Sequence, residues 1–407
     1  MELQLAWRNI WRNPRRTVII MIAVIIGVWT MVALTSLMRG IVNDMLENGI
    51  STLTGDIKLY ASGYHNDPSI EYRIDDPNSV ISKIAKTLPV DSKYAARVRV
   101  NAIASNARHS IGLTLVGIDP DQEKGVSFIG NGVVDGRMIS EDDNNAIVIG
   151  QALLEKFETR IGRKLILMSQ NSQNEIVSKA FKIVGVFRAK LASTEKQFVF
   201  VNKHSAQKML GIGNGISEIS VVINDHGKFE QTSQGIAEIL KDSDIEVHTW
   251  KDLLPMLTAY MEIFNGFIVL WYLVVFVAMA FGIVNTMLMA VFERMREFGL
   301  LKALGMKPML ILRSVLIESG IILIMGAIAG NLLAFGSVMM IAATGIDLSA
   351  LSSGFEYVGM SSVIYPEIFL KDVFLANVVV LILGLAVSTY PAVKASRITP
   401  VEAMAHT

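Results

Sequence analysis

The side chains that could perform bond chemistry are few and lie far apart in this sequence. The only Gly-Lys pair, Gly227-Lys228, could open a phosphate-binding loop, but Val222 stands where that motif requires glycine and Phe229 replaces its Ser or Thr. The histidines follow neither zinc-protease nor deaminase spacing, and no Gly-x-Ser-x-Gly elbow occurs. We therefore expect no nucleotide site, no catalytic residue and no local metal motif, although distant residues could still assemble a metal site. The histidines are His65, His109, His204, His226, His248 and His406.

The composition excludes further classes of function. Cysteine is absent, which removes disulfides, thiolate metal sites and iron–sulfur clusters. Lys plus Arg equals Asp plus Glu at 37 each, so no overall positive field attracts nucleic acid. Only 18% of the residues are charged and 52% are hydrophobic, whereas soluble proteins carry about 25% charged residues. This deficit of charge indicates a membrane protein.

Four long stretches carry no charged side chain, and each reaches the roughly 20 residues that a helix needs to cross a bilayer. They are residues 17–38, 263–292, 319–346 and 373–393. The first follows basic residues as a signal peptide would, but it ends without a small-x-small cleavage site, so we interpret it as an anchor. The flanking basic residues of 1–16 and 293–318 predict that both termini are cytoplasmic and that residues 39–262 lie outside.

Two of the predicted spans continue as helix beyond the bilayer. Apolar residues keep helical spacing from Val42 to Leu53 and again from Leu253 to Phe264. One helix over residues 17–53 would be ~55 Å long against ~30 Å of hydrocarbon, so we expect its excess to form a stalk packed against the second helix. The predicted stalk contacts involve Met45, Leu46, Leu257, Met261 and Phe264.

Small and charged residues give three further expectations for the membrane region. The spacing Gly326-x-x-x-Gly330 predicts close approach of two helices. Glu318 stands at the cytoplasmic mouth of the third span near Arg313, and we expect it to reach the interface or to pair locally rather than to form an ion path. Residues 1–16 predict an amphipathic interfacial helix, which either orients the first span or contacts a cytoplasmic partner.

The residues between the two stalks predict a compact α+β domain. Short runs of β-branched and aromatic residues predict strands over 55–61, 94–105, 110–116, 146–149, 164–168, 180–187, 197–201 and 218–223. Capping and helical periodicity predict helices over 77–88, 151–157, 203–210 and 228–240.

The segment between the second and third spans carries the most specific motif. It reads Glu293-Arg294-Met295-Arg296-Glu297-Phe298-Gly299-Leu300-Leu301-Lys302-Ala303-Leu304-Gly305. The pattern predicts an exposed amphipathic helix, with Phe298 and Leu301 apolar among charges and a stop at Gly305 and Pro308. The segment closely resembles the cytoplasmic coupling segment of the MacB/FtsX-like permeases, the membrane subunits of mechanotransmitting (type VII) ABC systems.

The resemblance extends over the whole chain. Four further segments of the sequence and its tail resemble motifs of the same family. They are Trp7-Arg8-Asn9 at the amino terminus, Val116-Gly117-Ile118-Asp119-Pro120, Gly136-Arg137 and Ile147-Val148-Ile149-Gly150 in the outer domain, and the pattern over 391–403 in the tail. It implies that a separate ATPase dimer binds ATP and Mg²⁺, so this chain holds no cofactor, and that two permeases pair as a homodimer or heterodimer in a bacterial inner membrane. A role in coupling to the ATPase is implied for Glu293, Arg294, Arg296, Glu297, Phe298, Gly299, Leu301, Lys302 and Gly305.

These expectations combine into one domain plan, an α-helical membrane protein with four transmembrane helices and a large extracytoplasmic α+β domain with porter-like and inserted lobes. Its segments are a cytoplasmic interfacial helix (1–16), transmembrane helix 1 with stalk (17–53), the periplasmic domain (54–250, inserted lobe about 110–205), stalk and helix 2 (251–292), the coupling helix (293–312), helix 3 (313–346), a short loop (347–372), helix 4 (373–393) and a cytoplasmic tail (394–407).

The subtype is the least determined part of the resemblance. The pattern around residues 116–150 and the lack of a fused ATPase are most similar to the LolC/LolE lipoprotein-releasing permeases, which implies extraction of lipoproteins or another amphiphile from the membrane. Members that recruit a periplasmic chaperone use a projecting hook, whereas residues 169–178 predict only a short polar connection. The alternatives are a MacB-like efflux permease with a periplasmic adaptor, an FtsX-like regulator of cell-wall hydrolases, and a secondary transporter, for which only Glu318 offers an intramembrane charge.

Overall fold

The computed structural model describes residues 2–348, 361 and 363–399. Internal contacts divide the chain into a membrane unit, residues 1–43, 260–348 and 363–407, and an outer unit, residues 44–259 and 349–362. The last part of the tail motif, with His406, and most of the predicted loop 347–372 lie outside the described residues.

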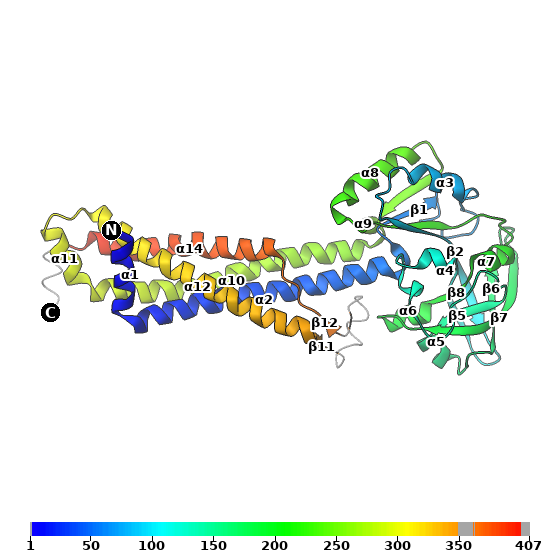
Figure 1. The fold of residues 1–407 in the computed structure, drawn as a ribbon, viewed down its shortest axis with the longest axis horizontal. Helices are drawn as coiled ribbons and strands as arrows, with labels where there is room; N and C mark the ends of the chain where they lie inside the picture. Colours follow the sequence, from blue (N-terminus) through cyan, green and yellow to red (C-terminus); the bar gives the residue numbers. More distant parts are fainter. Residues whose placement is uncertain (1, 349–360, 362, 400–407) are drawn as a thin grey trace. The chain divides into compact units, whose positions relative to one another are not determined.

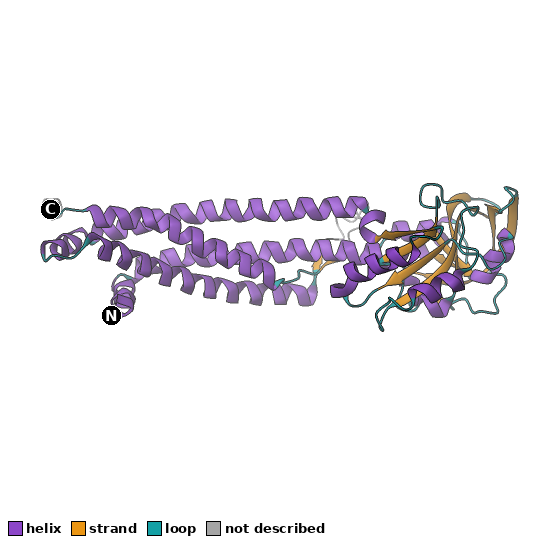
Figure 2. Ribbon diagram, turned by 90° about the horizontal axis from the view of Figure 1, so that it is seen from above, coloured by secondary structure: helices purple, strands orange, loops and turns teal. Residues whose placement is uncertain are grey.

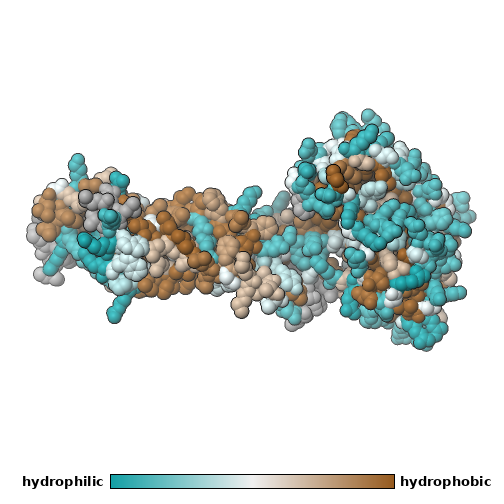
Figure 3. Space-filling view, viewed as in Figure 1, coloured by the Kyte–Doolittle hydropathy of each residue, from teal (hydrophilic) through white to brown (hydrophobic). Residues whose placement is uncertain are grey.

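Four long helices dominate the described part of the membrane unit, and each is long and apolar enough to cross a bilayer. This confirms the four predicted spans, and Figure 3 shows hydrophobic residues, in brown, over most of the helical surface that is in view. The long helices are α2 (Pro14–Gly49), α10 (Pro255–Glu293), α12 (Pro308–Thr344) and α14 (Leu370–Arg397). The unit also contains α1 (Glu2–Arg12), α11 (Met295–Ala303), β11 (Ile346–Asp347) and β12 (Val363–Ile364).

Two glycines of α12 lie directly against α2. A methyl group added at Gly326 would stand 2.7 Å from Val24 Cγ1, and one added at Gly330 would stand 2.9 Å from Val28 Cβ. Such distances leave no room for a side chain, so the two backbones approach as small residues in lipid allow. The sequence predicted a close approach, and the structure gives α2 as the neighbouring helix.

A partly buried ion pair joins α2 to the first turn of α14. Arg39 Nε and Nη2 donate to Asp372 Oδ2 and Oδ1 at 2.6 and 3.0 Å, and Nη1 donates to Asn265 Oδ1 of α10 at 2.9 Å. Thr35 donates to the hydroxyl of Tyr272 one turn earlier on α2. Because this forked geometry is both strong and directional, three helices are fixed at one level.

Helix α2 ends earlier than the sequence predicted. Regular helix stops at Gly49, and Ile50–Thr54 form a π-helical turn in which Leu53 has a φ of 67°. A left-handed backbone is costly for leucine, but its side chain is buried in the core of the outer unit. Residues 50–53 of the helix expected over 17–53 thus form this distorted turn, and the 36 residues of α2 before it extend ~54 Å.

The predicted stalk residues divide between the two units. In the outer unit Met45 and Leu257 are buried and Leu46 is half-buried, while in the membrane unit Met261 and Phe264 are half-buried. A methyl group at Gly49 would meet Leu254 Cδ1 at 2.7 Å, so α2 and the start of α10 also approach closely within the outer unit.

A ten-stranded sheet forms the framework of the outer unit, in the order β10-β1-β9-β2-β3-β8-β5-β7-β4, with β6 paired to β2 and β7. Figures 1 and 2 show its strands with short helices around them, the α+β domain that was predicted between the first two spans. The strands are β1 (Ile57–Ala61), β2 (Lys93–Ser105), β3 (Ser110–Ile118), β4 (Val133–Gly136), β5 (Ala146–Gly150), β6 (Lys164–Gln170), β7 (Ile176–Phe187), β8 (Phe198–Asn202), β9 (Glu218–Val222) and β10 (Ile245–Thr249). The helices are α3 (Pro77–Ile84), α4 (Pro120–Glu123), α5 (Gln151–Lys156), α6 (Ala192–Gln197), α7 (Lys203–Leu210), α8 (Phe229–Leu240) and α9 (Trp250–Leu253).

The long strand β2 belongs to two lobes. Its first residues, 93–97, pair with β9, and its later residues, 98–105, pair with β3 and in part with β6. Because β6 also pairs with β7, the strands β2, β3, β8, β5, β7 and β6 close into a ring, which leaves no free edge among them. The open lobe consists of β10, β1, β9 and the start of β2, with α3 and α8 contributing to its core.

In the outer unit, sequence reasoning missed two strands and misjudged one connection. β4 is short and largely exposed, and β10 carries polar Glu246 and His248 in alternation beside β1. Residues 169–178, predicted as a short polar connection, instead form a β-hairpin in which Gln170 pairs with Ile176. Ile176 is 83% exposed near the tip, so the hairpin also presents an apolar side chain.

The close contact of α12 with α2 predicts a large difference between two substitutions on the same helix. Gly330→Val should lower the thermal midpoint of the purified protein, because overpacking costs about 1–3 kcal/mol. Gly336→Val is the matched control, since a Cβ at Gly336 meets nothing within 4 Å. Equal midpoints for the two variants in detergent would contradict the packing described here.

Candidate functional site

The coupling segment is a separate short helix placed between two long ones. α10 ends at Glu293, Arg294 has non-helical backbone angles, and α11 then runs from Met295 to Ala303. Gly305 has a φ of 91°, a conformation that glycine adopts without strain, and Pro308 stands in the first turn of α12. The chain therefore reverses direction over few residues and places α11 at the end of the membrane unit where α10 stops and α12 begins.

A nearly buried ion pair fixes this reversal. Arg294 Nη1 donates to both carboxylate oxygens of Glu318 at 2.9 Å, and Asn9 Nδ2 donates to Oε1 at 2.8 Å. The side chains of Arg294 and Glu318 are only 12% and 9% exposed. Local pairing of Glu318 was one of the two predicted outcomes, but its partner is Arg294, not the neighbouring Arg313. The pair joins α12 to the residue between α10 and α11, and Asn9 adds α1.

A second, more exposed layer of charges ties α11 to α1. Arg12 Nη2 donates to Glu297 Oε1 at 2.5 Å, and Arg294 Nε donates to Glu297 Oε2 at 3.3 Å. Partial burial acts to raise the pKa of Glu297, but the hydrogen bond and charge of Arg12 outweigh it, so this pKa lies below its usual value. Glu293 accepts from Asn13 and Arg16 at 3.1 and 3.3 Å. The two acidic residues of the motif thus bind the amino-terminal segment of the same chain.

Two residues of the motif face inward, contrary to the predicted exposed pattern. Phe298 is 3% exposed in the core of the membrane unit, and Gly299 is also buried. The guanidinium of Arg294 lies 5.1 Å from the Phe298 ring centroid, within the range of a cation–π contact. Phe298 therefore anchors α11 to the bundle and is not available to a partner protein.

The outer face of the motif carries apolar side chains that the sequence interpretation passed over. Leu300 is 64% exposed and Leu304 is 77% exposed, whereas the predicted coupling residue Leu301 is 39% exposed. Met309 at the start of α12 is 68% exposed. We call Leu300, Leu301, Leu304 and Met309 the apolar cap. Spacing of three and four residues on α11 was the signal that could have identified Leu300 and Leu304.

The remaining predicted residues occupy the border of this face. Lys302 Nζ donates to the carbonyl oxygen of Ile398 in the tail at 2.8 Å, and the side chain of Arg296 is exposed.

The apolar residues of the predicted amphipathic helix α1 differ in their exposure. Ile10 is buried against the bundle, while Trp7 and Trp11 are about half exposed and stack edge to face. Exposed tryptophans suit a membrane interface, so this face of α1 is placed for lipid or for a partner.

The described residues contain no group of three or more His, Asp or Glu side chains that could hold a metal ion.

The ion pair of Arg294 predicts unequal effects of two acidic substitutions. Glu318→Gln should lower the free energy of unfolding by about 3 kcal/mol, because it leaves a nearly buried guanidinium without its counter-charge. Glu297→Gln, on an exposed pair, should cost less than about 1 kcal/mol. Thermal or denaturant unfolding in detergent measures both. A loss at Glu318 no larger than that at Glu297 would contradict the role of the buried pair.

Comparisons with known proteins agree with this arrangement. Residues 17–239 match the MacB-like periplasmic core domain, and residues 268–400 match the FtsX-like permease C-terminal domain. An uncharacterized ABC transporter permease of Methanocaldococcus jannaschii is 23% identical over 98% of this chain and 96% of its own length. The macrolide export ATP-binding/permease protein MacB of Bdellovibrio bacteriovorus is 21% identical over 99% of this chain and 61% of its own length.

A third relative is named for a different function. The lipoprotein-releasing system transmembrane protein LolC of Xylella fastidiosa is 21% identical over 79% of both chains. LolC is thus not specifically favoured over the other relatives. The chain belongs to the family of ABC transporter permeases that join a MacB-like periplasmic core domain to an FtsX-like permease domain.

Proposed function

We propose that this permease transmits ATP hydrolysis by a separate ATPase to its outer unit, and that the cargo is a lipoprotein or another amphiphile. The observation that carries the coupling role is the apolar cap, a set of exposed leucine and methionine side chains on α11, the turn after it and the start of α12. Exposed apolar clusters rimmed by charge are typical of protein interfaces. The nucleotide and its Mg²⁺ would be bound by the partner.

The contacts behind the apolar cap suit the transmission of force. α11 is anchored by Phe298 in the core and by the Arg294–Glu318 pair to α12. Asn9 donates to Glu318 and Arg12 donates to Glu297, so both α12 and α11 are connected to α1, which leads directly into α2. A displacement of α11 by an ATPase would therefore move the bases of α2, α10 and α12 together.

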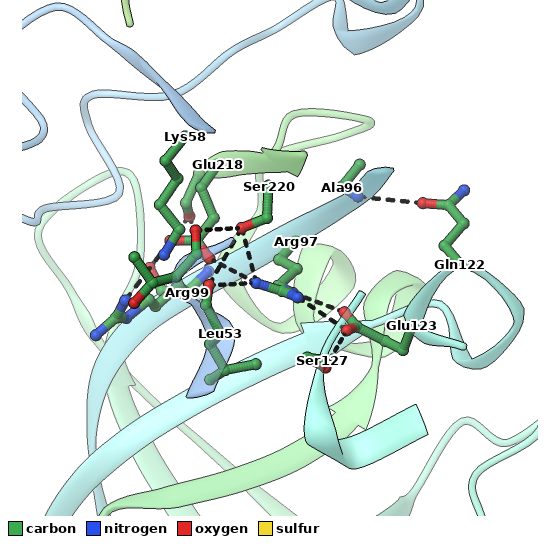
Figure 4. A network of polar contacts seen from close by, with 12 residues as sticks. Leu53, Lys58, Ala96, Arg97, Arg99, Gln122, Glu123, Ser127, Glu218 and Ser220 are labelled. Atoms are coloured by element: carbon green, nitrogen blue, oxygen red, sulfur yellow. Dashed lines mark hydrogen bonds and ion pairs between the residues drawn. The ribbon is translucent and has the colours of Figure 1, made fainter. Parts of the chain in front are cut away.

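Hydrogen bonds also fix the turn that follows α2 in the outer unit. Arg97 on β2 is fully buried and donates to the carbonyl oxygen of Leu53 at 2.7 Å, to Ser220 on β9 at 2.9 Å and to Glu123 at 2.6 and 2.9 Å (Figure 4). Burial alone would lower the pKa of Arg97, but the charges and hydrogen bonds of Glu123 and Glu218 together raise it above its usual value, so the guanidinium keeps its charge. Since β2 belongs to both lobes, a pull at Leu53 would reach both.

An apolar groove in the outer unit supports an amphiphilic cargo. The groove has a volume of about 600 Å³ and lies over the strands β2, β3, β6 and β7. Its lining includes Ile103, Leu113, Met168 and Ile176, and Ile103 and Ile176 are 46% and 83% exposed. Burying acyl methylene groups there would contribute about 0.8 kcal/mol each. The LolC relative is consistent with this cargo, whereas the MacB relatives favour the alternative of efflux with an adaptor.

The apolar cap predicts that docking of the ATPase depends on two leucines. Leu300→Glu combined with Leu304→Glu should abolish copurification of an ATPase with the tagged permease, because charges would be buried at the interface. The variant should keep its thermal midpoint, since both side chains are exposed. Val90→Glu, at a fully exposed position of the outer unit, is the control and should copurify normally. ATPase recovery equal to that of the control would refute the assigned contact.

The cargo is tested separately from the coupling. In a depletion strain of the source organism, lipoproteins should accumulate in the membrane that holds the permease, and acylated proteins should copurify with a variant that cannot hydrolyse ATP. Lipoproteins that still reach their destination after depletion would exclude release as the function. Retention of small hydrophobic compounds instead would identify the efflux alternative.

A further inference from the structure

A pocket of about 340 Å³ lies in the outer unit and is lined on its polar side by basic and phenolic groups. Lys58 and Tyr60 come from β1, Arg99 comes from β2, and Tyr64 and His65 follow β1. All residues that line it are among those that the structure describes, and no Asp or Glu is one of them. Its ionisable lining therefore consists of groups that are cations or hydrogen-bond donors near neutral pH.

The charges behind the pocket do not balance. Glu218 is fully buried, and its carboxylate lies 3.1 Å from Lys58, 3.4 Å from Arg97 and 3.7 Å from Arg99 (Figure 4). Arg97 is already paired with Glu123 at 2.6 Å. Lys58 and Arg99 thus share one carboxylate, and both line the pocket. When Lys58 is protonated, this cluster carries one positive charge more than its two carboxylates neutralise, and the excess lies on the side of the pocket.

The protonation states of the lining groups agree with an excess of positive charge at the pocket. Burial lowers the pKa of Lys58 to about 7 even though Glu218 acts to raise it, so charging this lysine costs free energy while the pocket holds no anion. Burial raises the pKa values of Tyr60 and Tyr64, so both hydroxyls stay protonated. Tyr64 donates its proton to the carbonyl oxygen of Arg99 at 2.8 Å, which leaves Tyr60 as the phenol that can donate to a ligand. Arg99 is 30% exposed and lies 5.7 Å from the Phe198 ring, so its position is restrained before any ligand binds.

We propose that this pocket binds a phosphate group, either as free phosphate or as the headgroup of a lipid. The Arg99 fork suits two phosphate oxygens, and Lys58 supplies a point charge behind them. The volume exceeds that of phosphate alone and leaves room for a short polar substituent such as glycerol. The proposal concerns a site in the outer unit and holds whatever the cargo or the ATPase contact of the proposed function proves to be.

The test uses the full-length protein in an uncharged detergent. Inorganic phosphate is titrated at constant ionic strength against chloride, and binding is followed by calorimetry and by the rise in thermal midpoint that a ligand of the native state causes. A water-soluble short-chain phosphatidylglycerol is titrated in parallel. We expect the wild type to bind at least one of the two, and the tighter ligand identifies the source of the phosphate group.

Variants decide whether this pocket is responsible. Arg99→Gln should weaken binding about tenfold or more, because it removes a charge-assisted contact. Arg108→Gln is the matched control, since Arg108 is an exposed arginine of the same unit outside the pocket and should bind as the wild type does. If Arg99→Gln fails to fold, Arg99→Lys and His65→Gln replace it, and each should weaken binding. No binding by the wild type, or equal affinity of the pocket variants and the Arg108→Gln control, overturns the proposal.

Discussion

Hydrocarbon offers no hydrogen-bond partners, and this constraint organises the whole chain. It requires the spans to be continuous helices and moves most charged side chains to the ends of those helices. The strong polar contacts of the membrane unit accordingly lie at two levels, Arg39 with Asp372 at one end and Arg294 with Glu318 at the other. Between them the helices meet through small residues such as Gly326 and Gly330. The unit is therefore fixed at its ends by ion pairs and closely packed between them.

The constraint also explains what the sequence could predict. Long stretches without charge are a local property, so the four spans, their order and the α+β domain after the first were all within reach. The partner of Glu318 was not, because Arg294 is 24 residues away and Asn9 is 309 away, and only the fold brings them together. The same holds for Phe298, whose inward orientation depends on the turn at Arg294 that redirects α11.

The basic pocket escaped sequence reasoning for a related reason. Arg97 and Arg99 alternate with apolar residues on a strand that was predicted, and such alternation normally indicates a solvent-exposed polar face. Here that face is covered by the extension of α2 and by α4, which supply the Leu53 carbonyl and Glu123. Covering a charged face is costly unless every charge is paired, so a partly matched cluster at this place indicates a role beyond stability.

The irregular turn that ends α2 indicates what that role is. A helix of 36 residues is stiff along its axis, but the π-helical turn Ile50–Thr54 that ends α2 has left regular hydrogen bonding and would yield first. Apolar packing around Leu53 would stabilise the turn without fixing its direction, because such contacts are non-directional. Arg97 instead binds the Leu53 carbonyl and both lobes through geometrically specific hydrogen bonds. A buried ionic cluster, which apolar residues could replace at little cost in stability, thus gives the turn after α2 a fixed direction relative to the strands of the outer unit.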